Sequence, residues 1–173
     1  MKTSRSLLLA ALAAALIAAC GQPEGPAGAT LAVEIDRSTA CALDGMLLAD
    51  YPGPKAQIHY AGRAEPDFFC DTVEMFSIYL KPEQARAVKA LFVQDMGKAD
   101  WNEPRGHWID ARSAWYVQGS SRKGSMGPTI ASFADEAAAQ KFAAEFGGKL
   151  YRFDAVTTDM VVLDGGALHD QRM

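Results

Sequence analysis

The sequence predicts an α+β fold made of two successive ββαβ-like units with mostly antiparallel sheets. Three observations lead to this prediction: short apolar runs bounded by glycine and proline, two amphipathic helical segments with acidic starts, and the same strand–strand–helix–strand order in both halves. The 173 residues are 49% hydrophobic and 22% charged, as in ordinary globular proteins. This composition excludes a disordered or disulfide-dense chain, and only three cysteines are present.

The N-terminus predicts a lipoprotein signal peptide over residues 1–19. Lys2 and Arg5 precede an uncharged apolar run over residues 7–19, which is short for a bilayer span of about 20 residues. The run ends in Ile-Ala-Ala-Cys-Gly, which resembles a bacterial lipobox, so we expect Cys20 to be acylated. An ordinary signal peptide cleaved after Ala19 is the alternative.

The predicted anchor places the chain on the periplasmic face of a membrane, and Gly21 after the lipid cysteine slightly favours the outer one. Residues 20–30 are rich in Gly, Pro and Ala and predict a flexible tether. We expect a folded domain over residues 31–160 and a frayed tail over 161–173. With a formal charge of −4 and no basic run, nucleic acid is not an expected partner.

In the first half of the domain, about residues 41–100, we expect a hairpin formed by the apolar run 45–50 and the alternating segment 55–61. His59 lies out of phase with the apolar face of this strand and is expected to face solvent. A helix follows over 71–80, with Asp71 and Glu74 at capping-box spacing. Pro82 can begin another helical turn, and residues 90–94 read as a strand.

The second half, about residues 101–160, repeats this layout. Strands are expected over 114–118 and 126–133, followed by a helix over 135–146 with acid in its first turn and Gly147-Gly148 at its end. Residues 149–153 predict a closing strand.

Sulfur-bearing side chains are the chemical feature that stands out. Three methionines, Met46, Met96 and Met126, each adjoin a glycine at the end of a predicted element. Cys41 lies five residues before Met46, Cys70 precedes the first helix, and His107 lies in a polar loop. Soft donors of this kind select Cu(I) among biological metals. Core packing of each methionine and a structural Cys41–Cys70 disulfide are the alternatives.

Motifs typical of enzymes and zinc sites are absent from the sequence: it contains no CxxC, HExxH, GxSxG, P-loop or dinucleotide fingerprint. We therefore expect a binding protein and not an enzyme.

The segment from Cys41 to Gln57 (CALDGMLLADYPGPKAQ) resembles the signature of the NosL family, the lipoprotein accessory factors of nitrous oxide reductase. The resemblance continues in order to Phe153. It runs through FCDT at 69–72, DMG at 95–97, HWIDA at 107–111, SAWYV at 113–117, GSMG at 124–127 and ASF at 131–133.

The resemblance implies a copper chaperone that holds Cu(I) and delivers it for the copper–sulfide centre of nitrous oxide reductase. The implied partners are the reductase and its membrane-linked maturation complex, including a periplasmic solenoid protein and an ABC transporter. It also implies two ββαβ units, similar to part of organomercurial lyase. A lyase activity and a purely structural docking lipoprotein are the competing functions.

For the copper site, the implied ligands come from Cys41, Met46, Met96, His107 and Met126, which are too many for one ion. Many relatives read CxxCGM, whereas this chain has Asp44 at the second cysteine position. Asp44 is therefore a possible oxygen ligand, and Cys70 is held in reserve as a further thiol.

Overall fold

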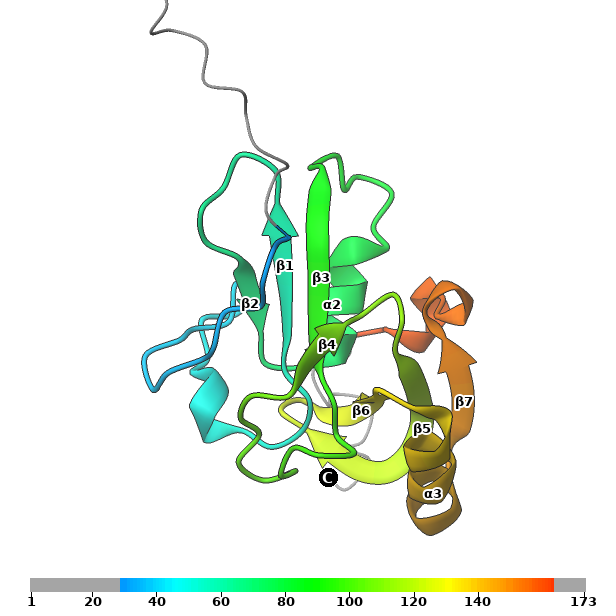
Figure 1. Ribbon diagram of the computed structural model, residues 1–173. Coiled ribbons are helices and arrows are strands. Elements are labelled where there is room, and N and C mark those ends of the chain that lie inside the picture. Colours follow the sequence, from blue (N-terminus) through cyan, green and yellow to red (C-terminus); the bar gives the residue numbers. More distant parts are fainter. Residues whose placement is uncertain (1–28, 164–173) are drawn as a thin grey trace, which may run out of the picture.

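The computed structural model describes residues 29–163, which form an α+β fold with two antiparallel sheets (Figure 1). The predicted fold class is confirmed. The predicted lipid-attachment residue Cys20, the signal peptide and the tail from residue 164 onward lie outside the described residues. Among the described residues, no helix is both long and apolar enough to cross a membrane.

The first unit runs strand, strand, helix, strand, which is the predicted order, although the first predicted strand at 45–50 is not one of its strands. It consists of β1 (Ala56–Tyr60), β2 (Asp67–Phe69), α2 (Thr72–Tyr79) and β3 (Val88–Gln94). A short strand, β4 (Trp108–Asp110), adds to its far edge, so the sheet order is β2-β1-β3-β4. Helix α2 begins after Asp71, whose side chain accepts a hydrogen bond from the Val73 N–H.

The second unit repeats the order with β5 (Trp115–Gly124), β6 (Gly127–Phe133), α3 (Glu136–Phe146) and β7 (Lys149–Arg152). Its sheet order is β6-β5-β7. In both units the first strand is therefore central, with the second strand on one side and the strand after the helix on the other. The repeat is one of topology, because the two halves share little residue identity.

The predicted hairpin between 45–50 and 55–61 is wrong. β1 pairs instead with β2 and β3, while Leu48–Asp50 forms a single 3-10 turn, η1. The rigid Tyr-Pro-Gly-Pro segment ends this turn and leads into β1, so the two segments do not pair. The turn expected at Pro82 does not become a helix, and the three-residue strands β2 and β4 were too short for the apolar pattern to indicate.

His59 is buried rather than solvent-facing, which corrects a second prediction. The reason is that every residue of β1 is buried, on both faces of the sheet. The N-terminal segment covers the second face, where Gln57 exchanges hydrogen bonds with the backbone of Val33 and also contacts the His59 ring. Alternation along a strand indicates exposure only where one face meets water.

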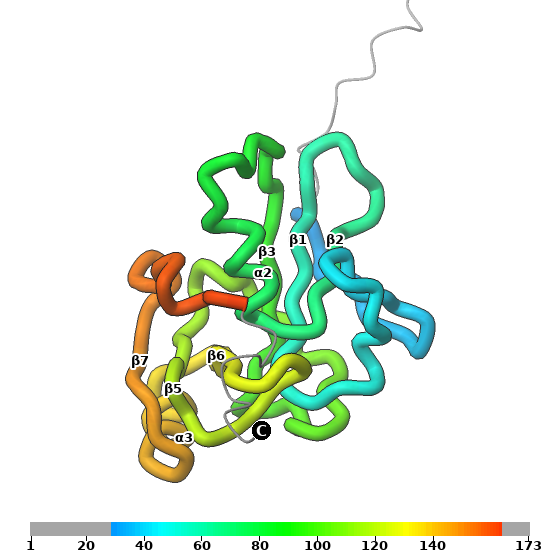
Figure 2. The backbone as a smooth tube through the Cα atoms, turned by 180° about the vertical axis from the view of Figure 1, so that it is seen from behind, coloured from blue at the N-terminus to red at the C-terminus, as the bar shows by residue number. Residues whose placement is uncertain are grey.

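Two hydrophobic cores hold the fold together. The larger one lies between the first sheet and α2 and includes Tyr116 and Ile130 from the second sheet; the smaller one joins the second sheet to α3 through Phe133 and Phe142. Helix α2 therefore lies between the two sheets. Figure 2 shows the chain after β7 returning toward the start of this helix.

The returning chain forms two further 3-10 turns, η2 (Phe153–Ala155) and η3 (Thr158–Met160). Phe153 and Val161 are buried in the larger core. Packing therefore continues to Val161, one residue into the segment expected to fray.

Candidate metal centre

Two thiols and a carboxylate converge where β2 meets α2. One ligand atom each from Cys41, Asp44 and Cys70 lies within 4.8 Å of the others. Both cysteines are buried and free, whereas Asp44 is exposed. We refer to these three residues as the thiol cluster, and it has one buried side and one side open to solvent.

The loop carrying Cys41 is fixed by backbone hydrogen bonds. The Cys41 N–H donates to the Met46 carbonyl at 2.8 Å, and the Ala42 N–H donates to Phe68 of β2 at 2.7 Å. Gly45 closes the loop with φ +78°, a left-handed conformation that glycine adopts at little cost. The Asp44 carboxylate accepts from the Met46 N–H at 2.9 Å, so its position is set by the same turn.

Glu74 does not complete the predicted capping box. It is 1% exposed, and its Oε2 lies 3.2 Å from the Cys41 sulfur. The first turn of α2 thus supplies a buried acid to the thiol cluster in place of a helix cap.

Hydrogen bonding divides the two thiols into different roles. The Cys70 S–H donates to Cys41 and, with the Leu43 N–H, lowers the pKa of Cys41 to about 6. The same donation, together with burial, raises the pKa of Cys70. Cys41 is therefore the thiolate at neutral pH, and Cys70 retains its proton.

Burial and the nearby Cys41 thiolate raise the pKa of Glu74 to about 9. At neutral pH the Glu74 carboxyl is therefore protonated and can donate to the thiolate. The site then has a soft anionic sulfur surrounded by three hydrogen-bond donors, and a cation could replace them.

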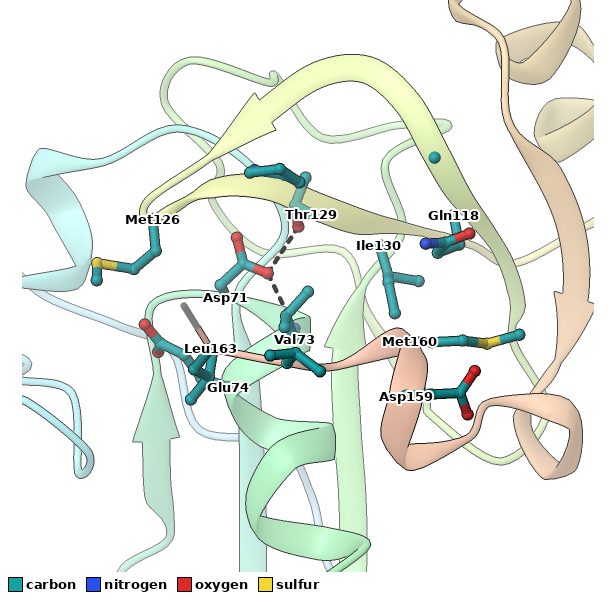
Figure 3. A pocket seen from close by; sticks show the side chains of 13 residues that line it. Asp71, Val73, Glu74, Gln118, Met126, Thr129, Ile130, Asp159, Met160 and Leu163 are labelled. Carbon is teal, nitrogen blue, oxygen red and sulfur yellow. Dashed lines mark hydrogen bonds between the residues drawn. The ribbon is translucent and has the colours of Figure 1, made fainter. Parts of the chain in front are cut away.

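A pocket of about 210 Å³ lies on the other side of Glu74. Figure 3 shows Asp71, held by Thr129 and Val73, at its centre, and Met126 and Glu74 extending toward the same side. Asp71 is 2% exposed, and burial raises its pKa to about 6. Within residues 29–163, Asp71 Oδ2 and Glu74 Oε1 are buried carboxylate oxygens with no hydrogen-bond partner.

Comparison with known proteins identifies the family of the chain. A sequence profile of the NosL family matches residues 32–161. The chain belongs to the NosL family.

Its curated relatives include the copper-binding lipoprotein NosL of Stutzerimonas stutzeri, which is 38% identical over 169 residues, covering 94% of this chain and 87% of that protein. The copper-binding lipoprotein NosL of Achromobacter cycloclastes is 34% identical over 166 residues, covering 94% of this chain and 85% of that protein. The crystal structure of the copper chaperone NosL from Shewanella denitrificans superposes with a TM-score of 0.72 at 42% identity. It covers 75% of this chain and 97% of that chain.

Of the predicted methionines, Met46 lies beside the cluster, and Met126 lies beside the pocket that Glu74 also lines. The Met46 carbonyl accepts from Cys41, and the Met46 side chain is half-buried against the larger core. Met126 lies in the turn between β5 and β6, 40% exposed, at the edge of the pocket that Glu74 also lines. Glu74 thus links Met126 to Cys41.

The structure does not bring Met96 and His107 to the thiols. Met96 packs in the smaller core with Trp101, on the α3 side of the second sheet. His107 is exposed and precedes β4, three strands away from β2 across the first sheet. Their roles as ligands stay predictions, and the geometry offers them no support.

Sequence reasoning did not find Glu74 or Asp71 as parts of this NosL site, nor Lys55, whose Nζ donates to the Cys70 carbonyl at 3.0 Å. Both acids were interpreted as helix-capping residues, because spacing alone does not distinguish a helix cap from a buried acid. Lys55 lies at the start of the alternating segment 55–61 expected from the sequence, and no role was predicted for it.

Proposed function

We propose that this protein is a lipid-anchored chaperone that binds Cu(I) at Cys41 and Cys70 and delivers it for maturation of nitrous oxide reductase. One observation carries the proposal. The Sγ atoms of two buried free cysteines lie within 4.8 Å of each other, in a chain whose relatives are named copper-binding lipoproteins. Thiolate and thioether sulfur are the donors that prefer Cu(I).

The protonation states support binding near neutral pH. Metal binding to a thiol ordinarily requires loss of its proton, but the pKa of Cys41 is lowered to about 6 by the Cys70 hydrogen bond. Cys41 can therefore bind the cation as a thiolate already formed. Glu74 stays protonated beside it and does not compete as a hard anionic ligand.

Met126 is the additional donor that the geometry favours. Its thioether carries no charge and no proton, and its turn is exposed at the edge of the pocket beside Glu74. A cation held by one or two fixed thiols and one exposed thioether stays open to a soft donor from a partner, as a carrier requires.

The delivery step is supported by apolar side chains around the site. Leu43 and Leu47 flank Cys41 and Met46, and Met126 and Leu163 flank the pocket; all four are at least 39% exposed. Exposed apolar residues beside the cluster and beside the pocket are the kind of surface that proteins use for interaction. We assign this surface to a periplasmic partner of the maturation complex, reached from an acyl anchor at Cys20. The same surface would also serve a docking lipoprotein that transfers no metal.

Anaerobic titration of the reduced soluble domain with Cu(I) against a competing chelator tests the proposal. We expect Cys41→Ser to weaken Cu(I) binding at least a hundredfold, with Cys70→Ser and Met126→Leu each weakening it about tenfold, the scale of one lost ligand interaction. Met96→Leu is the matched control, because that methionine packs in the other core.

A wild-type domain that loses copper to a weak chelator would refute the chaperone and leave the docking function. Transfer is tested by mixing the copper-loaded domain with copper-free nitrous oxide reductase and following the visible absorbance of its copper–sulfide centre. Binding without any transfer to the reductase or to its maturation proteins would also contradict the proposed function.

A further inference from the structure

Cys41 and Cys70 are two free thiols that the fold brings together from distant parts of the sequence. Their Sγ atoms lie within 4.8 Å of each other, and both residues are buried. The remaining cysteine of the chain, Cys20, belongs to the predicted lipid anchor and lies outside the described residues. Two thiols at this separation can bind a metal ion together, and they can also be oxidised to a disulfide with each other.

The two cysteines lie on segments that already face each other. The Ala42 N–H donates to the Phe68 carbonyl at 2.7 Å, which holds the loop of Cys41 beside the strand that ends just before Cys70. The Cys70 Sγ also lies 3.6 Å from the Met46 carbonyl, at the other end of the same loop. A disulfide bond is about 2 Å long, so the two sulfurs need to approach by at most about 3 Å. Such an approach requires local movement only.

The loop of Cys41 is the side that can move. Cys70 is 0% exposed and is followed directly by Asp71, which caps α2, so its backbone is fixed by the helix start. Cys41 is carried by a short surface loop in which Leu43 is 40% exposed and Gly45 has φ +78°. A glycine in the left-handed region adapts its backbone at little steric cost. An external reagent therefore reaches Cys41 before Cys70.

We propose that Cys41 and Cys70 are a redox modification site, which an external disulfide converts into an intramolecular disulfide that no longer binds copper. The formation of the bond follows from the geometry of the two thiols alone. Its effect on copper rests on the proposed function and adds a means of regulating that same site.

The oxidation is a thiol–disulfide exchange with a small disulfide of the glutathione disulfide class. The thiolate form of Cys41 attacks one sulfur of the oxidant, releases one thiolate and keeps the other half of the oxidant as a mixed disulfide. The Cys70 sulfur then attacks Cys41 Sγ and displaces this second half, which leaves with the Cys70 proton. Two electrons thereby pass from the two cysteines to the external disulfide, which is reduced to two thiols.

Copper and the disulfide exclude each other in this scheme. The thiolate is the form of cysteine that binds metal, and a sulfur in a disulfide is not a thiolate, so both thiol ligands are lost in one step. Bound Cu(I) in turn occupies the Cys41 sulfur that the exchange must use. Because copper binds the reduced form alone, it favours that form by mass action. A loaded carrier would resist oxidation, whereas an empty one would be closed to metal.

Mass spectrometry tests the pairing on the chain of residues 20–173 carrying Cys20→Ser, in which Cys41 and Cys70 are the remaining cysteines. After treatment with glutathione disulfide, we expect this chain to lose the mass of two hydrogen atoms and to carry no glutathione. The same chain with Cys70→Ser should keep glutathione on Cys41, because the second attack is missing. A chain with both cysteines that keeps its thiols free, or that accumulates glutathione, would overturn the proposal without recourse to any variant.

Anaerobic titration with Cu(I) against a competing chelator tests the consequence for metal binding. The disulfide form should bind Cu(I) at least about a hundredfold more weakly than the reduced form, and a dithiol reductant should restore the affinity. Loading the reduced chain with Cu(I) before adding glutathione disulfide should slow disulfide formation about tenfold or more. Equal affinities of the two forms, or equal oxidation rates with and without copper, would overturn the regulatory role. If the reduced chain binds no Cu(I), the proposed function fails, and the mass change alone decides whether the disulfide forms.

Discussion

Replacing Glu74 by Gln should change how the stability of the reduced, metal-free protein depends on pH. Burial raises the pKa of Glu74 from its ordinary 4.5 to about 9, so the folded protein holds this proton more tightly than the unfolded chain does. The Glu74 contribution to stability is complete below pH 4.5 and is lost as the pH rises toward 9.

Cys41 acts in the opposite direction. Its pKa is lowered from 9.0 to about 6, so its contribution to stability grows as the pH rises from 6 to 9. In this window the two residues cancel, because folded and unfolded chains each hold one proton on the pair. The free energy of unfolding should therefore fall between pH 4.5 and 6, by about 2 kcal/mol at about 1.4 kcal/mol per pH unit, and stay level from pH 6 to 9.

Glu74→Gln removes one side of this balance. The free energy of unfolding should then rise by about 4 kcal/mol between pH 6 and pH 9, since Cys41 titrates alone over three pH units. In the wild type the pair contributes no slope there. Urea denaturation of the reduced metal-free domain at pH 6, 7.5 and 9 measures this pH dependence for the wild type and for Glu74→Gln. Glu145→Gln, on the exposed face of α3, is the matched control and should follow the wild type.

Parallel curves for wild type and Glu74→Gln between pH 6 and 9 would refute the assigned protonation states. Cys41→Ser provides the mirror test. With the thiol removed, Glu74 titrates alone, and stability should fall as the pH rises above 6.

Three further predictions concern packing around the site. Gly124→Ala should destabilise the protein by about 1–3 kcal/mol in urea denaturation, because the added Cβ would overlap Asp71 Oδ2 and lie 2.9 Å from Thr129 Cβ; a loss under 0.5 kcal/mol would contradict the close packing. Thr129→Val removes the 2.6 Å hydrogen bond to Asp71 and should raise the pKa of that acid further, measurable by NMR titration of its carboxyl carbon; an unchanged pKa would argue against the bond. Phe142→Ala should cost about 3–5 kcal/mol of stability by opening the smaller core, yet leave Cu(I) affinity within threefold of wild type; loss of copper binding in the folded variant would show that the two cores are coupled.

The sequence was most informative where local rules decide the structure. Asp71 caps α2 as predicted, and the glycine pair at 147–148 ends α3, because caps depend on neighbouring residues alone. Asp135 was expected in the first turn of its helix and instead caps it, one residue earlier. The strand order within each sheet needed the structure. β2 is three residues long, and its pairing with β1 depends on contacts that no local pattern encodes.

The candidate site was predictable in part. Cys41 and Met126 could be named from chemistry and from the family resemblance, since sulfur is conspicuous in a sequence. Cys70 was underestimated, because a thiol before a helix reads as a core residue until the loop at 41–46 is seen to pack against it. Glu74 could not be predicted as a site residue, because its burial results from tertiary packing. Its spacing from Asp71 was already explained by a capping box.

The position of Met126 in the turn between β5 and β6 has a consequence for the timing of release. The loop at Cys41 is tied to β2 and to Met46 by main-chain bonds, whereas the hairpin tip that carries Met126 is exposed. If both sulfurs bind one ion, the thioether can swing away while the rest of the fold stays in place. Release of the ion would then begin with the loss of the Met126 thioether. Cys41 would still hold the ion until a ligand from the recipient protein replaces it.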